Sequence, residues 1–225
     1  DQVLCNVIKI CGPELKFLDL GRTKITAEGL TDRRPQYKCF NKLVKLNLRG
    51  CRQLKGLKNI ISSCGNSLKH LNLEGTNITD IKIFVSEAKF RINFLNLSDC
   101  KRLTDVDLQQ ILAVSGVFLK FLFLSNTNIT GEGLALKTKH LSLVRLQKLK
   151  LNGCTQLTSL GALQFMFIAG KNLKTLDLSE TKITGEGFAG APVIPTTLKN
   201  LDLSRCKSLT DAGLLEVLRT VGPHA

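Results

Sequence analysis

The sequence predicts an α/β solenoid shaped as a curved horseshoe, with a parallel sheet on its concave face and helices and irregular loops on its convex face. Two observations carry this prediction. Apolar residues at the first, fourth and sixth positions of a short segment recur in eight copies, 24 to 28 residues apart. The ninth position of that segment is alternately Thr and Cys. A chain of 225 residues exceeds the usual size of one compact core, but repeats grow by stacking.

Each copy predicts a short strand, because its residues alternate between apolar and polar and one face is therefore buried. The following residues return along the outer side, and stacked units share one core because none can bury its leucines alone. We therefore predict one domain over residues 1–225, with residues 1–14 as a partial N-terminal repeat or cap. The copies begin at Leu15, Leu43, Leu68, Ile92, Leu119, Leu146, Leu173 and Leu198.

The ninth position divides the copies into two alternating kinds. Thr occupies it in the odd copies and Cys in the even ones, namely Thr23, Cys51, Thr76, Cys100, Thr127, Cys154, Thr181 and Cys206. With a period of this size, the pattern resembles the cysteine-containing and ribonuclease-inhibitor-like leucine-rich repeats. Residues 198–214 are similar to the repeats of F-box substrate receptors. The resemblance implies an inward-facing ninth side chain that bonds to loop backbone, and it leaves the partner open because such repeats bind many unrelated proteins.

Two helices are predicted on the outer side. Thr104 and Thr210 can each cap a helix N-terminus, so we expect helices over 105–115 and 211–221. Residues 130–134 and 184–188 begin similarly but contain two glycines each, which weakens a helix. Residues 31–35 and 189–195 are predicted to be loops, the latter because it contains two prolines.

The net charge of +14 has two interpretations. The Lys and Arg residues are dispersed, which favours a solubility charge spread over a large surface. A polyanion such as nucleic acid or a heparin-like chain is the alternative partner. Lys occupies the second position of five copies: Lys16, Lys69, Lys120, Lys174 and Lys199. These lysines form either a solvated edge or a row of cations that binds an acidic partner or a polyanion. No apolar run has the length of a membrane span.

The cysteines favour reduced thiols and an intracellular location, cytoplasmic or nuclear. Cysteines two repeats apart are separated by at least about 9.6 Å, beyond the roughly 7 Å limit for a disulfide. The cysteine clusters typical of extracellular repeat proteins are missing. Three glycosylation-type triplets, at Asn77, Asn96 and Asn128, are typical of secreted proteins, but they fall inside the repeat pattern and are explained by it. Secretion is the alternative, and the protein would then be an extracellular receptor that recognises immune-type ligands, similar to the variable lymphocyte receptors of jawless fish.

No catalytic or metal-ligating pattern is visible in the sequence. Neither His70 nor His140 has a Cys or carboxylate at the spacing of a metal site or catalytic triad. Phosphate-binding and dinucleotide motifs are absent from the sequence. We therefore expect a protein that is not an enzyme and has no cofactor or metal.

One part of the predicted concave face departs from the repeat. The third and fifth positions of each copy point outward, and in the fourth and fifth copies they hold Phe94, Phe121 and Phe123. Lys148 and Lys150 lie beside them on the next strand. The rings could simply pack on one another, but an exposed aromatic cluster with a cationic rim is typical of a protein-binding hot spot. We expect a protein partner, acidic in character, at a site made of His70, Phe94, Asn96, Phe121, Phe123, Lys148 and Lys150.

Overall fold

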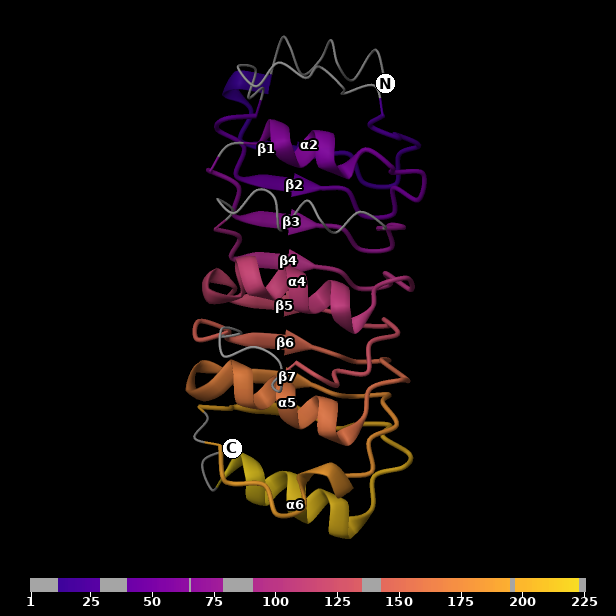
Figure 1. Cartoon of the computed structure of the whole chain (residues 1–225), viewed down its shortest axis with the longest axis vertical. Coiled ribbons are helices and arrows are strands. Elements are labelled where there is room, and N and C mark those ends of the chain that lie inside the picture. Colours follow the sequence, from indigo (N-terminus) through magenta and orange to yellow (C-terminus); the bar gives the residue numbers. More distant parts are fainter. Residues whose placement is uncertain are drawn as a thin grey trace.

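The computed structural model describes residues 12–28, 40–64, 66–78, 91–134, 143–194 and 197–222. Within them, eight strands form one parallel sheet in sequence order, stacked along the long axis of the molecule (Figure 1). This confirms the predicted α/β solenoid. The strands are β1 (Phe17–Asp19), β2 (Lys45–Asn47), β3 (His70–Asn72), β4 (Phe94–Asn96), β5 (Phe121–Phe123), β6 (Lys148–Lys150), β7 (Thr175–Asp177) and β8 (Asn200–Asp202).

The register of the sheet follows the repeat. Each strand occupies the third to fifth positions of a copy, so its central leucine pairs with the central leucine of the next strand, as Leu122 does with Leu149. Both of these side chains are fully buried. Because successive side chains of a strand point to opposite faces, the third and fifth positions lie on the other, open face of the sheet.

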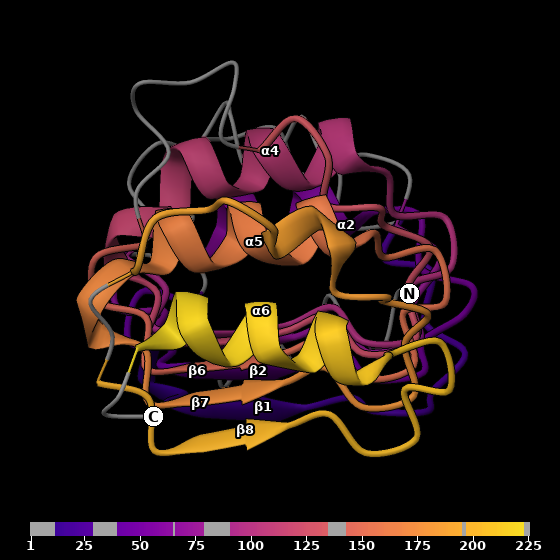
Figure 2. The same ribbon diagram turned by 90° about the horizontal axis from the view of Figure 1, so that it is seen from below.

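Helices cover the buried face of the sheet and leave the opposite face open (Figure 2). The predicted helices over 105–115 and 211–221 are present, and their N-termini are capped by Thr104 and Thr210 as expected. The α-helices are α2 (Leu57–Ser63), α4 (Asp105–Ser115), α5 (Ser159–Ala169) and α6 (Asp211–Val221), and the short 3-10 helices are η1 (Gly12–Glu14), η2 (Gly116–Phe118), η3 (Gly170–Asn172) and η4 (Glu186–Phe188).

Helix α5 was not predicted, because it lacks an amphipathic pattern. Phe165 and Met166 are buried, and even Gln164 on the same helix is 4% exposed. A helix that is apolar on nearly all sides gives no 3.6-residue periodicity in the sequence. Its N-terminus nevertheless carries a capping signal, since the Thr158 hydroxyl accepts a hydrogen bond from the backbone N–H of Gly161.

The glycines of residues 130–134 and 184–188 are explained by close packing. A Cβ added to Gly185 would lie 2.4 Å from the Cα of Gly213, in the first turn of α6. Gly131 stands in the same relation to Gly161 of α5, at 2.9 Å. These segments therefore form turns and η4 rather than α-helices, because the backbone must approach the next helix at a distance that only glycine allows.

Several predictions fall on residues outside the described ranges. They concern residues 1–11 of the expected cap, the loop at 31–35, and His140. Among the described residues, no helix combines the length and the apolar character needed to cross a membrane.

Candidate partner-binding face

Three phenylalanine rings meet on the open face of the sheet. The ring of Phe94 lies 5.1 Å from that of Phe123 in a T-shaped contact and 6.4 Å from that of Phe121 in a tilted one. Phe94 pairs with Phe121 in the register between β4 and β5, and Phe123 pairs with Asn96. All three phenylalanines are half-buried. They pack on one another and still present apolar surface to solvent.

His70 extends the cluster toward the N-terminus. Its imidazole stacks on the ring of Phe94 with centroids 5.7 Å apart and planes inclined by 27°. Partial burial lowers the pKa of His70, and the positive charge of Lys45 on the neighbouring strand lowers it further. At neutral pH the imidazole is therefore uncharged and behaves as a fourth ring of the cluster.

Two lysines border the cluster on its C-terminal side. The ammonium of Lys150 lies 5.6 Å from the centroid of Phe123, within the range of a cation–π contact. Lys148 pairs with Phe121 in the sheet register. Apolar rings and cations are thus adjacent on one surface. We call it the aromatic patch, and it consists of His70, Phe94, Phe121, Phe123, Lys148 and Lys150.

Asn96 is on the same face but is 7% exposed. Its amide nitrogen donates to a carboxylate oxygen of Glu74 at 3.1 Å, and its amide oxygen accepts from the backbone N–H of Ser98 at 3.0 Å. Glu74 in turn pairs with Arg49 at 2.9 Å. Both polar groups of the Asn96 side chain are therefore used within the chain, where they support the strand beneath the rings.

The aromatic patch continues into a depression of about 320 Å³ over β1 to β4. Its lining includes Phe17, Lys45, His70 and Phe94. The ammonium of Lys45 lies 5.2 Å from the ring centroid of Phe17, which is 61% exposed. Phe17 and Lys45 were not predicted to belong to the site, although both occupy the same third-position row as Phe94.

A second, larger depression of about 900 Å³ lies among the loops that follow the strands. Its charged lining residues have mixed signs: Arg22, Arg49, Arg52, Glu74, Asp99 and Lys101. Arg49 is bound to Glu74, and the ammonium of Lys101 donates to the carbonyl oxygen of Asn126 at 2.5 Å. Part of the positive charge in this depression is therefore engaged within the chain.

The cysteines of the described ranges are buried and unpaired: Cys51, Cys64, Cys100, Cys154 and Cys206. Burial raises the pKa of Cys64 to about 12, and it also raises the pKa of Cys100 and of Cys154. Such thiols are poor nucleophiles, because the thiolate is the reactive form. No group of three or more potential metal-ligating side chains occurs in the part of the chain that the structure describes.

Comparison with protein families agrees with the repeat. A family model described as Leucine Rich repeat matches residues 66–81, 171–188 and 195–218. A search of curated proteins finds no match. Among solved structures, the chain is similar to an internalin from Listeria monocytogenes, with 15% identity and a TM-score of 0.44, over 87% of this chain and 72% of the internalin.

Proposed function

Because this chain is a leucine-rich repeat protein, we propose that it is a non-enzymatic scaffold that binds a protein partner on the open face of its sheet, at the aromatic patch. Repeats of this architecture are protein-interaction scaffolds in general, since their stacking creates an extended binding surface. Beyond this general role, we propose which face of the sheet and which residues bind the partner.

The observation that carries the proposal is the aromatic cluster itself. Asn72 on β3 and Asp177 on β7 occupy the fifth position, where β5 has Phe123. The repeat does not need a ring there, because the core lies on the other face of the sheet. Half-exposed aromatic side chains that the fold does not require are the residues most often found at binding hot spots.

The surroundings of the rings indicate the chemistry of the partner. Phe94, Phe121 and Phe123 would contact apolar side chains of the partner, while the ammonium groups of Lys148 and Lys150 would pair with its carboxylates. His70 is uncharged at neutral pH and would add apolar contact. We propose an acidic protein segment that carries one or two large apolar residues. The buried, unpaired cysteines favour a reducing compartment, the cytoplasm or the nucleus.

A peptide-display library tests the proposal without a known partner. Peptides selected by the full wild-type chain should be enriched in large apolar and acidic residues. Their affinity should fall by at least about tenfold for a Phe121→Ala, Phe123→Ala double variant, which is the loss expected of hot-spot residues. Phe167→Ala is the matched control, because Phe167 is an exposed ring on α5, away from the open face of the sheet.

A photo-activatable residue gives a second readout. Placed at Phe121, it should cross-link to the selected peptide, whereas the same residue at Leu215, which is 65% exposed on α6, should not. Peptides that bind the folded double variant as tightly as the wild type would refute the aromatic patch as the binding site.

A further inference from the structure

A different surface, the edge of the sheet from which the strands begin, carries one cation for every repeat. In repeats one, three, five and seven the cation occupies the second position of the repeat, as Lys69 does. In repeats two, four and six it is the residue immediately before the first apolar position, as Arg91 is. The eighth repeat follows the odd pattern with Lys199. We call this row the amino-edge ladder, and it consists of Lys16, Lys42, Lys69, Arg91, Lys120, Arg145, Lys174 and Lys199.

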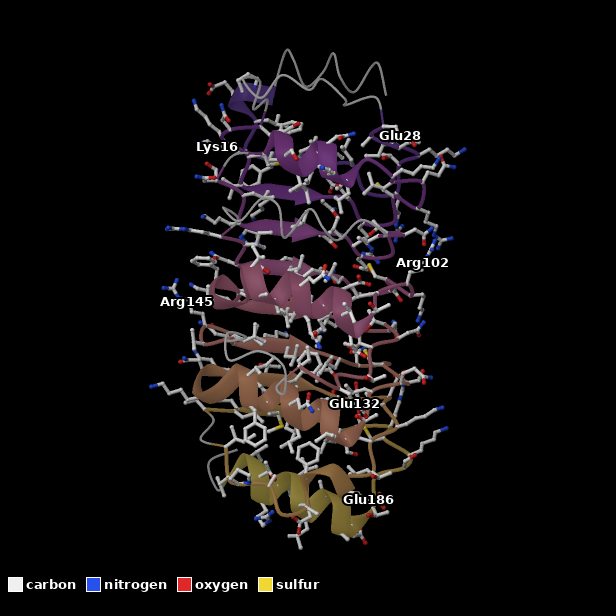
Figure 3. All side chains as sticks on the ribbon, viewed as in Figure 1. Lys16, Glu28, Arg102, Glu132, Arg145 and Glu186 are labelled. Carbon is white, nitrogen blue, oxygen red and sulfur yellow. The ribbon has the colours of Figure 1, made fainter. Side chains whose placement is uncertain are left out.

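The backbone holds these residues in line. All strands are parallel and in register, so the residues that precede them gather at one edge. Hydrogen bonds continue the sheet through the second position, from the N–H of Lys120 to the carbonyl of Asn93 at 2.8 Å and from the N–H of Lys199 to the carbonyl of Lys174 at 2.8 Å. Lys16 and Arg145 lie on the same flank of the molecule (Figure 3). Neighbouring cations therefore belong to adjacent repeats, whose strands are about 4.8 Å apart.

Acidic residues are segregated from the amino-edge ladder. In the described segments that lead into the eight strands, Glu14 is the only carboxylate, and it pairs with Lys42 at 2.8 Å. Glu28, Glu132 and Glu186 lie on the opposite flank (Figure 3). Some cations near that flank are paired, as Arg205 is with Glu180 and Lys55 is with Glu28. Carboxylates are thus interspersed with the cations on one flank, whereas the described segments of the other flank carry only Glu14.

The side chains of the ladder are available to a partner. Seven of the eight are exposed, and Lys69 is half-buried. Besides the pairing of Lys42, the guanidinium of Arg91 lies 5.5 Å from the ring centroid of Phe118, a contact that leaves its charge uncompensated. Eight strands at about 4.8 Å give the row a length of about 34 Å.

We propose that the amino-edge ladder binds the phosphate backbone of a nucleic acid duplex, without reading its sequence. Regularly spaced single charges fit a partner whose own charge is continuous and regular. A nucleic acid duplex is a stiff rod of this kind, because it carries one phosphate charge for about every 1.7 Å of its axis. Lys, which binds phosphate as a point charge, makes up six of the eight residues.

Other anionic partners fit this row less well. A single strand is usually held by bases stacked on exposed rings, and the ring of Phe118 beside the ladder is already covered by Arg91. An acidic protein would use the aromatic patch, where cations and rings adjoin. A sulfated polysaccharide belongs to an oxidising compartment, and the buried cysteines of the described ranges are unpaired. The ladder is separate from the aromatic patch, so the two proposals stand independently.

The test compares two variants of the full chain that each lose four positive charges. The ladder variant is Lys69→Gln, Lys120→Gln, Arg145→Gln and Lys174→Gln. The control variant is Lys24→Gln, Arg102→Gln, Lys182→Gln and Lys207→Gln, at exposed positions that follow the strands. Thermal unfolding should be similar for both, because seven of the eight altered residues are exposed and Lys69 is half-buried.

The probe is a fluorescent DNA duplex of about 20 base pairs with arbitrary sequence, titrated over a range of salt concentrations. The ladder variant should bind at least about tenfold more weakly than the wild type. The negative slope of log K against log salt should become less steep by about three to four, since each lost phosphate contact removes about 0.9 from its magnitude. The control should stay within about twofold. An equal loss in both variants would show a net-charge effect and overturn the proposal.

Competition and footprinting give independent readouts. A single strand, a heparin fragment and poly-glutamate of matched charge should each compete more weakly than the duplex; a competitor that binds as tightly as the duplex would overturn the assignment. Acetylation of wild-type lysines should be slowed by the duplex at Lys16, Lys120 and Lys199 and unchanged at Lys24 and Lys182. Absence of duplex binding even at low salt would also refute the proposal.

Discussion

The hydroxyl of Thr127 and the thiol of Cys154 donate to one carbonyl oxygen, that of Leu124, at 2.7 and 3.0 Å. The oxygen and sulfur atoms are themselves 3.4 Å apart. The same arrangement occurs three more times, with Thr23 and Cys51 at Leu20, Thr76 and Cys100 at Leu73, and Thr181 and Cys206 at Leu178. The structural unit is therefore a pair of repeats, which accounts for the alternation of Thr and Cys in the sequence.

A double-mutant cycle on this pair should be non-additive. Thr127→Val keeps the shape of the side chain and removes one donor, while Cys154→Ala removes the other. Each single change leaves the carbonyl of Leu124 with a partner and should lower the free energy of unfolding by about 1 kcal/mol. Loss of both donors costs more than the two single changes together, because a buried acceptor without a partner is penalised in full.

Chemical denaturation of the four proteins measures this coupling. We expect the double variant to be destabilised beyond the sum of the single variants by at least about 0.5 kcal/mol. Thr127→Val combined with Cys206→Ala, which belongs to the next pair, is the control and should be additive. Additivity in both combinations would mean that the shared carbonyl does not couple the two side chains.

The eighth position of every repeat has a left-handed backbone, with φ between 58° and 71°. The residues are Arg22, Gly50, Gly75, Asp99, Asn126, Gly153, Glu180 and Arg205. A Cβ at Gly75 would meet no atom closer than 3.9 Å, so a substitution there is opposed by backbone strain alone. Gly75→Ala should lower the free energy of unfolding by about 1 to 2 kcal/mol.

Gly75→Asn is the matched substitution, because Asn tolerates the left-handed region better than Ala and already occupies the equivalent position at Asn126. Thermal or urea unfolding should show that Gly75→Asn recovers a large part of the loss. Equal stability of the Ala and Asn variants would contradict a cost that arises from φ.

The strands could be predicted because their signal is local. Each central leucine is followed two residues later by another leucine, as Leu122 is by the buried Leu124, and the period of two decides which face is open. Helix α4 could be predicted for the same reason, since Thr104 and Asp107 form a capping box within four residues.

The remaining features depend on contacts between repeats. Asn96 is buried because its side chain bonds to Glu74 on the preceding repeat. Position 213 requires glycine because a Cβ there would lie 1.9 Å from the carbonyl oxygen of Thr184. The depression over β1 to β4 depends on residues from four copies. Such relations have no fixed spacing within one repeat, so a pattern read along the chain does not contain them.

Alkaline pH should destabilise the protein through Cys64. Burial raises the pKa of this thiol from 9.0 to about 12, so the unfolded chain loses its proton at lower pH than the folded one. The contribution to stability is complete below pH 9 and is lost as pH rises toward 12. Each pH unit in this window should lower the free energy of unfolding by up to about 1.4 kcal/mol from this group.

Urea unfolding at pH 8 and pH 10.5 checks the expectation. The decline between the two pH values should be smaller in Cys64→Ala than in the wild type, whatever the packing loss of the variant at pH 8. A decline of the same size in both proteins would assign the alkaline sensitivity to other groups.

Acid should act on the aromatic patch through His70. Its pKa is lowered by burial first and by the charge of Lys45 second, so the folded state takes up a proton at lower pH than the unfolded chain, whose histidine titrates near 6.5. Stability is therefore unaffected above that value, falls as pH decreases through it, and stops falling once the folded histidine is protonated. Protonation would also place a cation against the ring of Phe94 at the binding surface.

An NMR titration of the His70 imidazole separates the two causes. Lys45→Gln should raise the pKa of His70 without restoring its ordinary value, because the larger contribution, burial, is unchanged. Lys174→Gln removes a lysine from the region of β7, far along the sheet, and should leave the titration of His70 as it is. A pKa unmoved by Lys45→Gln would leave burial as the whole cause, and the electrostatic link between β2 and the aromatic patch would be wrong.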